Sequence, residues 1–189
     1  QKTAYEIGVR LVGSEMCIRD SILLFKTSII FAEGYDVFGI GIYDVKFDGS
    51  SSNYATDIRY ERRFDNTLFD IGPEEDNFFY LKPFAGVEFT TDSAFYAITG
   101  IYLEDNLGDL MLGEENKWNL TPSFGLGYYD DGDGKKLGHN LEFRTTLEVS
   151  YQLKNSDRIG ISFGHISNAN IGDKNPGVEI LNFSYQKPF

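Results

Sequence analysis

The sequence has almost no cysteine, few prolines and no long uninterrupted apolar run. Its single cysteine, Cys17, excludes an intrachain disulfide framework. No stretch is both apolar and long enough, at about 20 residues, to cross a membrane as a helix. Basic residues are outnumbered by acidic ones, and the net charge of −12 argues against nucleic acid as a partner, because neutralising phosphates requires clustered Lys and Arg.

Glycine and aromatic residues are abundant instead. The 189 residues include 20 glycines and 15% aromatics but only 5 prolines, which is more typical of an all-β chain than of a helical one. A transmembrane strand needs only about 9 to 11 residues and alternates in polarity. The mean hydropathy of −0.29 is therefore compatible with a membrane barrel.

The first 32 residues differ in character from the rest. Residues 1–21 contain the string VGSEMCIRDS, which resembles translated sequencing-adapter read-through. We interpret them as a non-native artefact, with a genuine N-terminal extension as the alternative. Residues 22–32 resemble the remnant of a signal peptide that ends at Ala32, with a first strand or a buried segment as the alternative. The folded domain is then expected to span residues 33–189.

Two C-terminal segments alternate in polarity with the two-residue period of a strand. In residues 157–167, DRIGISFGHIS, isoleucines and a phenylalanine share one face, and glycines and a serine share the other. Residues 179–189 repeat the pattern. Aromatic faces opposite small polar faces are typical of a membrane barrel, which shows its apolar side to lipid. A soluble lipocalin-like barrel would turn the aromatic faces inward and leave the small polar faces as its surface.

Strand character recurs along the whole domain. The sequence predicts strands at residues 35–46, 54–64, 78–89, 94–104, 117–129, 141–151, 157–167 and 179–189. An even number of strands in a closed barrel leaves no unpaired backbone edge in lipid. We therefore predict an all-β fold, namely an eight-stranded antiparallel transmembrane β-barrel.

Charged residues fall on the predicted inner faces. Glu142, Arg144 and Glu148 share one face of their strand, and residues 57–63, DIRYERR, place two acids and two bases on one face. The segment 57–63 suits a charged interior, but taken alone it is better explained as the solvated strand face of a soluble protein. Small barrels fill their interiors with side chains, and buried charges must pair. We predict a polar, side-chain-filled interior without a pore. Arg144 is expected to pair with the acids two and four residues away on its own strand.

Loop lengths predict the orientation of the barrel. The turn at residues 154–156 is short and the segment 168–178 is long, and outer-membrane barrels place short turns on the periplasmic side. The strand at 157–167 would then end near the outer leaflet. Other connections conflict with this rule, because 89–93 is short and should be external, whereas 65–77 and 105–116 are long and should be periplasmic.

The last residue is Phe189, on an alternating strand. A terminal aromatic in this setting resembles the C-terminal signature that the outer-membrane assembly machinery recognises. We expect that machinery as a partner and the bacterial outer membrane as the location.

Three polar residues fall on faces that are otherwise apolar, namely His165, Ser167 and Glu179. A serine hydroxyl needs a neighbouring imidazole to take its proton, and the imidazole needs a third group to orient it. His165 and Ser167 are about 6.6 Å apart along the strand, within reach of convergent side chains. Glu179 begins the next strand on the same face. The alternative is that all three lie in the headgroup zone without a chemical role.

The segment between these strands, NANIGDKNPG, supplies hydrogen-bond donors for an oxyanion. Asn175 is the preferred donor because Asn175-Pro176-Gly177 predicts a rigid turn. Asn168, Asn170 and backbone N–H groups near Gly172 are the other candidates. The remaining histidine, His139, follows an acidic glycine-rich loop that we interpret as a solvated external turn.

The string GHISNANIGDKNPGVE resembles the terminal motif of the PagL-type lipid A deacylases, a family of eight-stranded outer-membrane barrels. The resemblance covers about residues 140–189. It implies that Ser167 is the nucleophile, His165 the general base and Glu179 the orienting acid, with Asn168 and Asn175 supporting the oxyanion or the geometry of the site. It also implies hydrolysis of the 3-position ester of lipid A in lipopolysaccharide, releasing a 3-hydroxy fatty acid without metal or cofactor.

Two functional interpretations therefore remain. The first is a serine esterase that acts on lipid A, with a homodimer left open. The second is a non-catalytic eight-stranded barrel with a role in adhesion or envelope structure. The alternating strands, the polar interior and Phe189 fit both, so only the three polar residues separate them.

Overall fold

A computed structural model describes residues 33–46, 54–71, 79–112 and 116–189 of the chain. Both N-terminal predictions, the artefact at 1–21 and the signal remnant at 22–32, lie outside the described residues. The described residues from Glu33 onward form one compact unit. None of its helices is long and apolar enough to cross a membrane.

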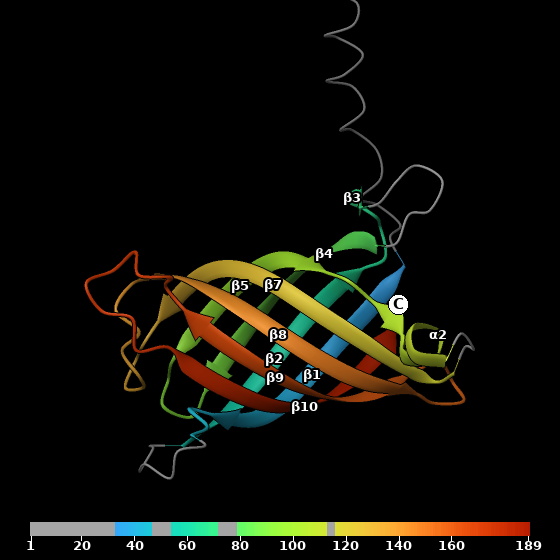
Figure 1. Cartoon of the computed structure of the whole chain (residues 1–189). Helices are drawn as coiled ribbons and strands as arrows, with labels where there is room; N and C mark the ends of the chain where they lie inside the picture. Colours follow the sequence, from blue (N-terminus) through green and yellow to red (C-terminus); the bar gives the residue numbers. More distant parts are fainter. Residues whose placement is uncertain (1–32, 47–53, 72–78, 113–115) are drawn as a thin grey trace, which may run out of the picture. The chain divides into compact units, whose positions relative to one another are not determined.

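Eight long antiparallel strands form a closed barrel in this part of the chain (Figure 1). They are β1 (Gly34–Tyr43), β2 (Ala55–Phe64), β4 (Phe79–Thr90), β5 (Phe95–Tyr102), β7 (Trp118–Asp130), β8 (Leu141–Gln152), β9 (Arg158–Ser167) and β10 (Val178–Pro188). Each of these eight strands pairs with the next one along the chain, including β2 with β4. Pairing of β1 with β10 closes the ring. The predicted eight-stranded barrel is confirmed, with strand bounds within three residues of those expected.

The two long connections that conflicted with the loop-length rule contain structure of their own. β3 (Phe69–Ile71) extends the pairing of β4, and β6 (Asp105–Asn106) pairs with β7 ahead of the short helix α2 (Leu107–Leu112). Both connections lie at the end of the barrel where β1 begins and β10 ends (Figure 1). Added elements therefore account for part of their length, and the strand bounds on either side of them lie within two residues of those predicted.

The two faces of each strand separate as the alternation predicted. On β9, Ile161 is 44% exposed whereas the next residue, Ser162, is 2% exposed. The large exposed apolar side chains form the outer wall, and the inner wall carries glycine, serine, threonine and charged residues. An apolar exterior around a polar interior is the arrangement of a barrel whose solvent is lipid.

Ion pairs fill much of the interior. Arg63 from β2 donates to Glu148 at 2.6 Å and to Glu61 at 3.1 Å, and Arg144 from β8 bonds Glu88 at 2.7 Å and also Glu61. The predicted side-chain-filled interior is confirmed. The expectation that Arg144 pairs with acids on its own strand is wrong, because its long side chain reaches across the barrel to β2 and β4.

Candidate active site

His165 and Glu179 lie directly opposite each other on β9 and β10. The imidazole Nδ1 of His165 is 3.2 Å from Oε1 of Glu179, and both side chains are on the outer wall, 46% and 37% exposed. Residues directly opposite in an antiparallel pair have Cβ atoms about 4.5 to 5.5 Å apart, so the strand register alone holds these two side chains together. Sequence alternation placed both on this face correctly.

Ser167 is the last residue of β9 and lies two positions after His165, on the same outward face. It is half-buried, and its cross-strand neighbour on β8 is Phe143. Among the described residues, no hydrogen bond links Ser167 to His165. Such bonds are often long in unliganded sites and shorten when substrate binds. Because Nδ1 faces Glu179, Nε2 is the ring nitrogen available to the serine.

Asn168 follows Ser167 directly and is fully buried. Its side-chain Nδ2 donates to the carbonyl oxygens of Leu137 at 2.9 Å and Lys174 at 2.7 Å, and its Oδ1 accepts the N–H of Asn170 at 2.9 Å. These bonds tie the end of β9 to two loops. Of the two roles expected for Asn168, its contacts favour support of the geometry over donation to an oxyanion.

Asn175 lies in the loop that leads into β10. Its side-chain Oδ1 accepts the backbone N–H of Asn168 at 3.0 Å, so the amide is held against the residue that follows Ser167. With the oxygen engaged, the NH₂ group is the part of this side chain that can donate to a substrate. The predicted turn at residues 175–177 thus contacts the end of β9, the strand that carries Ser167.

The loop between β7 and β8 is less solvated than predicted. Leu137 is 1% exposed, and Lys135 Nζ is 2.5 Å from Oδ1 of Asp44. His139 accepts the N–H of Leu141 through Nδ1 at 2.9 Å, which fixes its ring as a local cap. The signal that sequence reasoning missed was Leu137, one apolar residue in a polar loop. A single leucine in such a place marks an anchor to the body of the protein.

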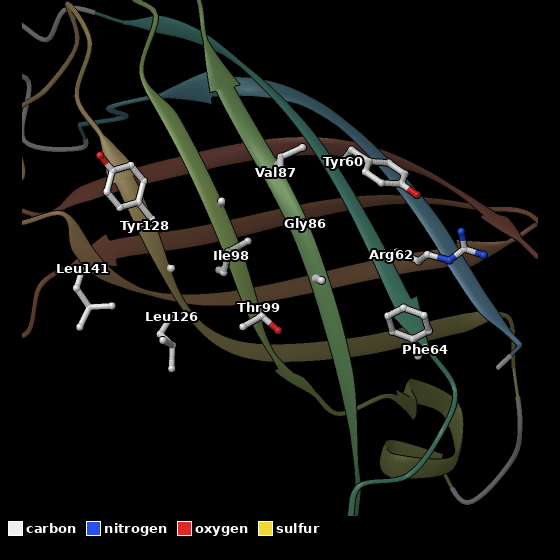
Figure 2. A pocket seen from close by; sticks show the side chains of 13 residues that line it. Tyr60, Arg62, Phe64, Gly86, Val87, Ile98, Thr99, Leu126, Tyr128 and Leu141 are labelled. Carbon is white, nitrogen blue, oxygen red and sulfur yellow. The ribbon is translucent and has the colours of Figure 1, made fainter. Parts of the chain in front are cut away.

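An open hollow also marks the outer wall, between β2 and β7 (Figure 2). Small residues of β4 and β5, such as Ala85 and Ala97, form its floor, and Tyr60, Leu126 and Tyr128 form its sides. None of the triad candidates lines it. Among the described residues, no group of three or more His, Cys, Asp or Glu side chains is arranged to hold a metal ion.

Comparison with known proteins gives the family and the fold. The model of one family, described as lipid A 3-O-deacylase (PagL), matches residues 86–188. The chain belongs to this family. The matched region contains every candidate site residue named above, so the resemblance noted in the terminal motif is confirmed at the level of the family.

Two individual relatives illustrate the likeness. Lipid A deacylase PagL of Bordetella bronchiseptica (strain ATCC BAA-588 / NCTC 13252 / RB50) is 34% identical over 55 residues, 29% of this chain and 31% of that protein. The aligned part thus spans about a third of the curated relative. The crystal structure of the outer membrane enzyme PagL superposes with a TM-score of 0.60 at 15% identity, covering 82% of this chain and 99% of that one, and supports the fold.

Proposed function

We propose that the chain is a bacterial outer-membrane serine esterase that hydrolyses the 3-position acyl ester of lipid A. The observation that carries the proposal is the cross-strand pair of His165 and Glu179 on the outer wall, with Ser167 on the same face of the same strand. Membership of the lipid A 3-O-deacylase family supplies the substrate class.

In this mechanism Ser167 Oγ attacks the ester carbonyl while Nε2 of His165 takes the hydroxyl proton. Glu179 accepts from Nδ1–H, orients the ring and stabilises the imidazolium that forms. The tetrahedral oxyanion accepts hydrogen bonds from the Asn175 amide and from backbone N–H groups of the same loop. Collapse releases the sugar hydroxyl, which receives the proton from His165. Water, activated by the same imidazole, then frees the 3-hydroxy fatty acid from Ser167.

An outward site suits a substrate that is itself part of the membrane. Ser167 lies at the end of the barrel opposite the two chain ends of the described domain, since β10 runs back from it to Pro188. We place this end at the outer leaflet, where lipopolysaccharide resides. Lipid A then approaches His165 and Ser167 sideways and keeps its acyl chains in the bilayer throughout.

The test is mass analysis of lipid A from bacteria that carry residues 33–189 in the outer membrane behind a signal peptide. Wild type should remove one hydroxyacyl chain, and Ser167→Ala or His165→Asn should restore the full acylation pattern. Ser156→Ala is the matched control, because this serine lies in the turn at the opposite end of the barrel. It should deacylate like wild type.

Unaltered lipid A in the presence of a correctly folded wild-type barrel would reject the enzyme and favour a role in adhesion or envelope structure. Removal of a chain from another position would keep the esterase but reject the regiochemistry.

A further inference from the structure

Gly177 lies against the imidazole of His165. It is buried, precedes the first residue of β10 and has a φ of +59°, in the left-handed region. A Cβ atom added there would lie 2.7 Å from Cε1 and 3.3 Å from Nε2 of His165. A carbon-to-carbon contact of 2.7 Å is well inside van der Waals separation, about 3.5 to 4.0 Å. Any side chain at 177 would therefore displace the ring.

The contacted edge of the ring is the one that matters for proton transfer. Nδ1 faces Glu179 at 3.2 Å, so the Cε1–Nε2 edge is the part of His165 left for the serine. We propose that Gly177 is a positioning residue for His165. Because Gly177 lacks a Cβ, the imidazole can stay where Nδ1 contacts Glu179 and Nε2 is the nitrogen left for Ser167. This inference rests on the proposed function for its catalytic consequence and on geometry for the ring placement.

The backbone at Gly177 is held from both sides. After it, Val178 pairs with Ile166 in the β9–β10 ladder. Before it, the Asn175 side chain accepts the N–H of Asn168 at 3.0 Å. With the main chain fixed on either side, the ring of His165 is the softer partner and would have to yield to a Cβ.

Backbone strain and side-chain contact are separable effects at this position. Alanine in the left-handed region costs about 1 to 2 kcal/mol, whereas asparagine adopts it more readily. The same loop accommodates other residues there, with φ of +53° at Ala169 and +64° at Asn170. Gly177→Ala and Gly177→Asn both introduce a Cβ but differ in strain. If the contact with His165 is what matters, both variants should behave alike.

Imidazole NMR reports ring placement without reference to catalysis. The chain has two histidines, so ¹⁵N-histidine labelling gives two sets of ring signals, and His139→Gln identifies those of His165. Both Gly177 variants should shift the His165 ring signals. Gly134→Ala is the matched control, because it adds a Cβ in another loop with Asp131 O as its nearest neighbour, at 3.1 Å. That control should leave the His165 signals unchanged.

Kinetics with lipid A in mixed micelles supply the second readout. Misplacement by about 1 Å can cost roughly a hundredfold in rate. We expect kcat to fall about 10- to 100-fold in both Gly177 variants with little change in KM, and to stay at the wild-type value in Gly134→Ala. Electrophoretic heat-modifiability of each variant verifies that the barrel is folded.

Three results would overturn the inference: His165 signals that do not move in folded Gly177 variants, wild-type kcat in either variant, or recovery of activity in Gly177→Asn alone, which would assign the effect to backbone strain. An inactive wild type whose His165 signals still respond to Gly177→Ala would refute the proposed function and leave the ring placement supported.

Discussion

At the scale of single residues, the candidate site depends on alternation within two strands. His165 and Ser167 share a face because they are two positions apart, and Glu179 meets His165 because the β9–β10 register pairs them. The three side chains have different contacts. Replacing each one should therefore change the deacylation rate by a different amount.

Glu179→Ala should reduce deacylation less than Ser167→Ala or His165→Asn. In the proposed mechanism the carboxylate orients the imidazole and does not itself exchange atoms with substrate. In a comparable triad, removal of the acid is roughly a hundredfold less damaging than removal of the nucleophile or the base. Single-turnover rates on purified lipid A would measure the difference. Equal losses in all three variants would contradict the role given to Glu179.

At the scale of elements, two loops at the Ser167 end of the barrel and the end of β9 are joined through a single buried side chain. Asn168 bonds the carbonyl oxygens of Leu137 and Lys174, which belong to the β7–β8 and β9–β10 loops. Ser167 is the adjacent residue in the chain. The order of the two loops and the placement of Ser167 are therefore coupled.

Asn168→Ala should loosen both loops and leave the barrel strands intact. Each buried group left without its partner costs about 1 to 3 kcal/mol, and the local loop structure bears that cost. Hydrogen exchange by mass spectrometry should show faster exchange at 131–140 and 168–177, with a fall in deacylation.

Asn155→Ala is the matched control for that experiment, because Asn155 also donates a side-chain hydrogen bond within a turn, to Asp157 at 2.5 Å, but at the opposite end of the barrel. It should leave exchange in the two loops at the Ser167 end unchanged. Identical exchange profiles for Asn168→Ala and wild type would refute the coupling.

Strands were predictable from the sequence because their signal is local. A period of two identifies a strand and both of its faces. For the charged segment 57–63, the solvated strand face favoured by that segment alone is wrong, because its alternate charged residues are buried inside the barrel. Partners across the barrel were not predictable in this way. Arg144 bonds Glu61 and Glu88 because strand order and tilt bring β2 and β4 within its reach, and neither is encoded near residue 144.

The site was predictable to the same extent. The shared face of His165, Ser167 and Glu179 follows from alternation alone, and the structure brings His165 and Glu179 together. The role proposed for Gly177 depends on its positive φ and on its contact with the imidazole of His165 from β9. The Asn-Pro-Gly motif predicts a turn but not that contact. The anchoring role of Leu137 could not be predicted from the sequence, because it depends on the hydrogen bond between its carbonyl oxygen and the side chain of Asn168.

At the scale of the whole molecule, stability resides inside the barrel and the candidate chemistry resides outside. The neighbours Arg62 and Arg63 show the contrast. Arg63 is 3% exposed and bonds two acids, whereas Arg62 is 44% exposed, 3.9 Å from Asp36 and stacked on Phe189.

Arg63→Met should destabilise the barrel by about 3 to 5 kcal/mol, because it removes the cation nearest to buried Glu148 and one of the cations paired with buried Glu61. Arg62→Met, one residue away, should cost about 1 kcal/mol or less, since exposed ion pairs contribute little. Urea unfolding in lipid vesicles, followed by electrophoretic mobility, would compare the two. Similar losses for both variants would mean that the interior pairs do not carry the stability assigned to them.

The outer wall should contact lipid directly, and the single tryptophan can report on this. Trp118 begins β7, is 48% exposed and packs edge-on against Tyr151 with ring centroids 4.9 Å apart. Aromatic residues at the ends of membrane strands lie at the interface. Quenchers attached near the lipid headgroup should therefore reduce Trp118 fluorescence more than quenchers at the chain ends.

Trp118→Phe provides the background for that measurement. Strong quenching by aqueous acrylamide together with no effect of lipid-bound quenchers would contradict a membrane-facing wall.

The alternation of faces has one further consequence, for how such a protein can change over generations. Along β9 a substitution at Ser162 disturbs the packed lumen, whereas one at Ile161, which is 44% exposed, changes the surface that faces lipid. Substitutions at adjacent positions should thus have unrelated structural effects. The outer surface of the barrel can therefore change over generations while the packed interior stays the same.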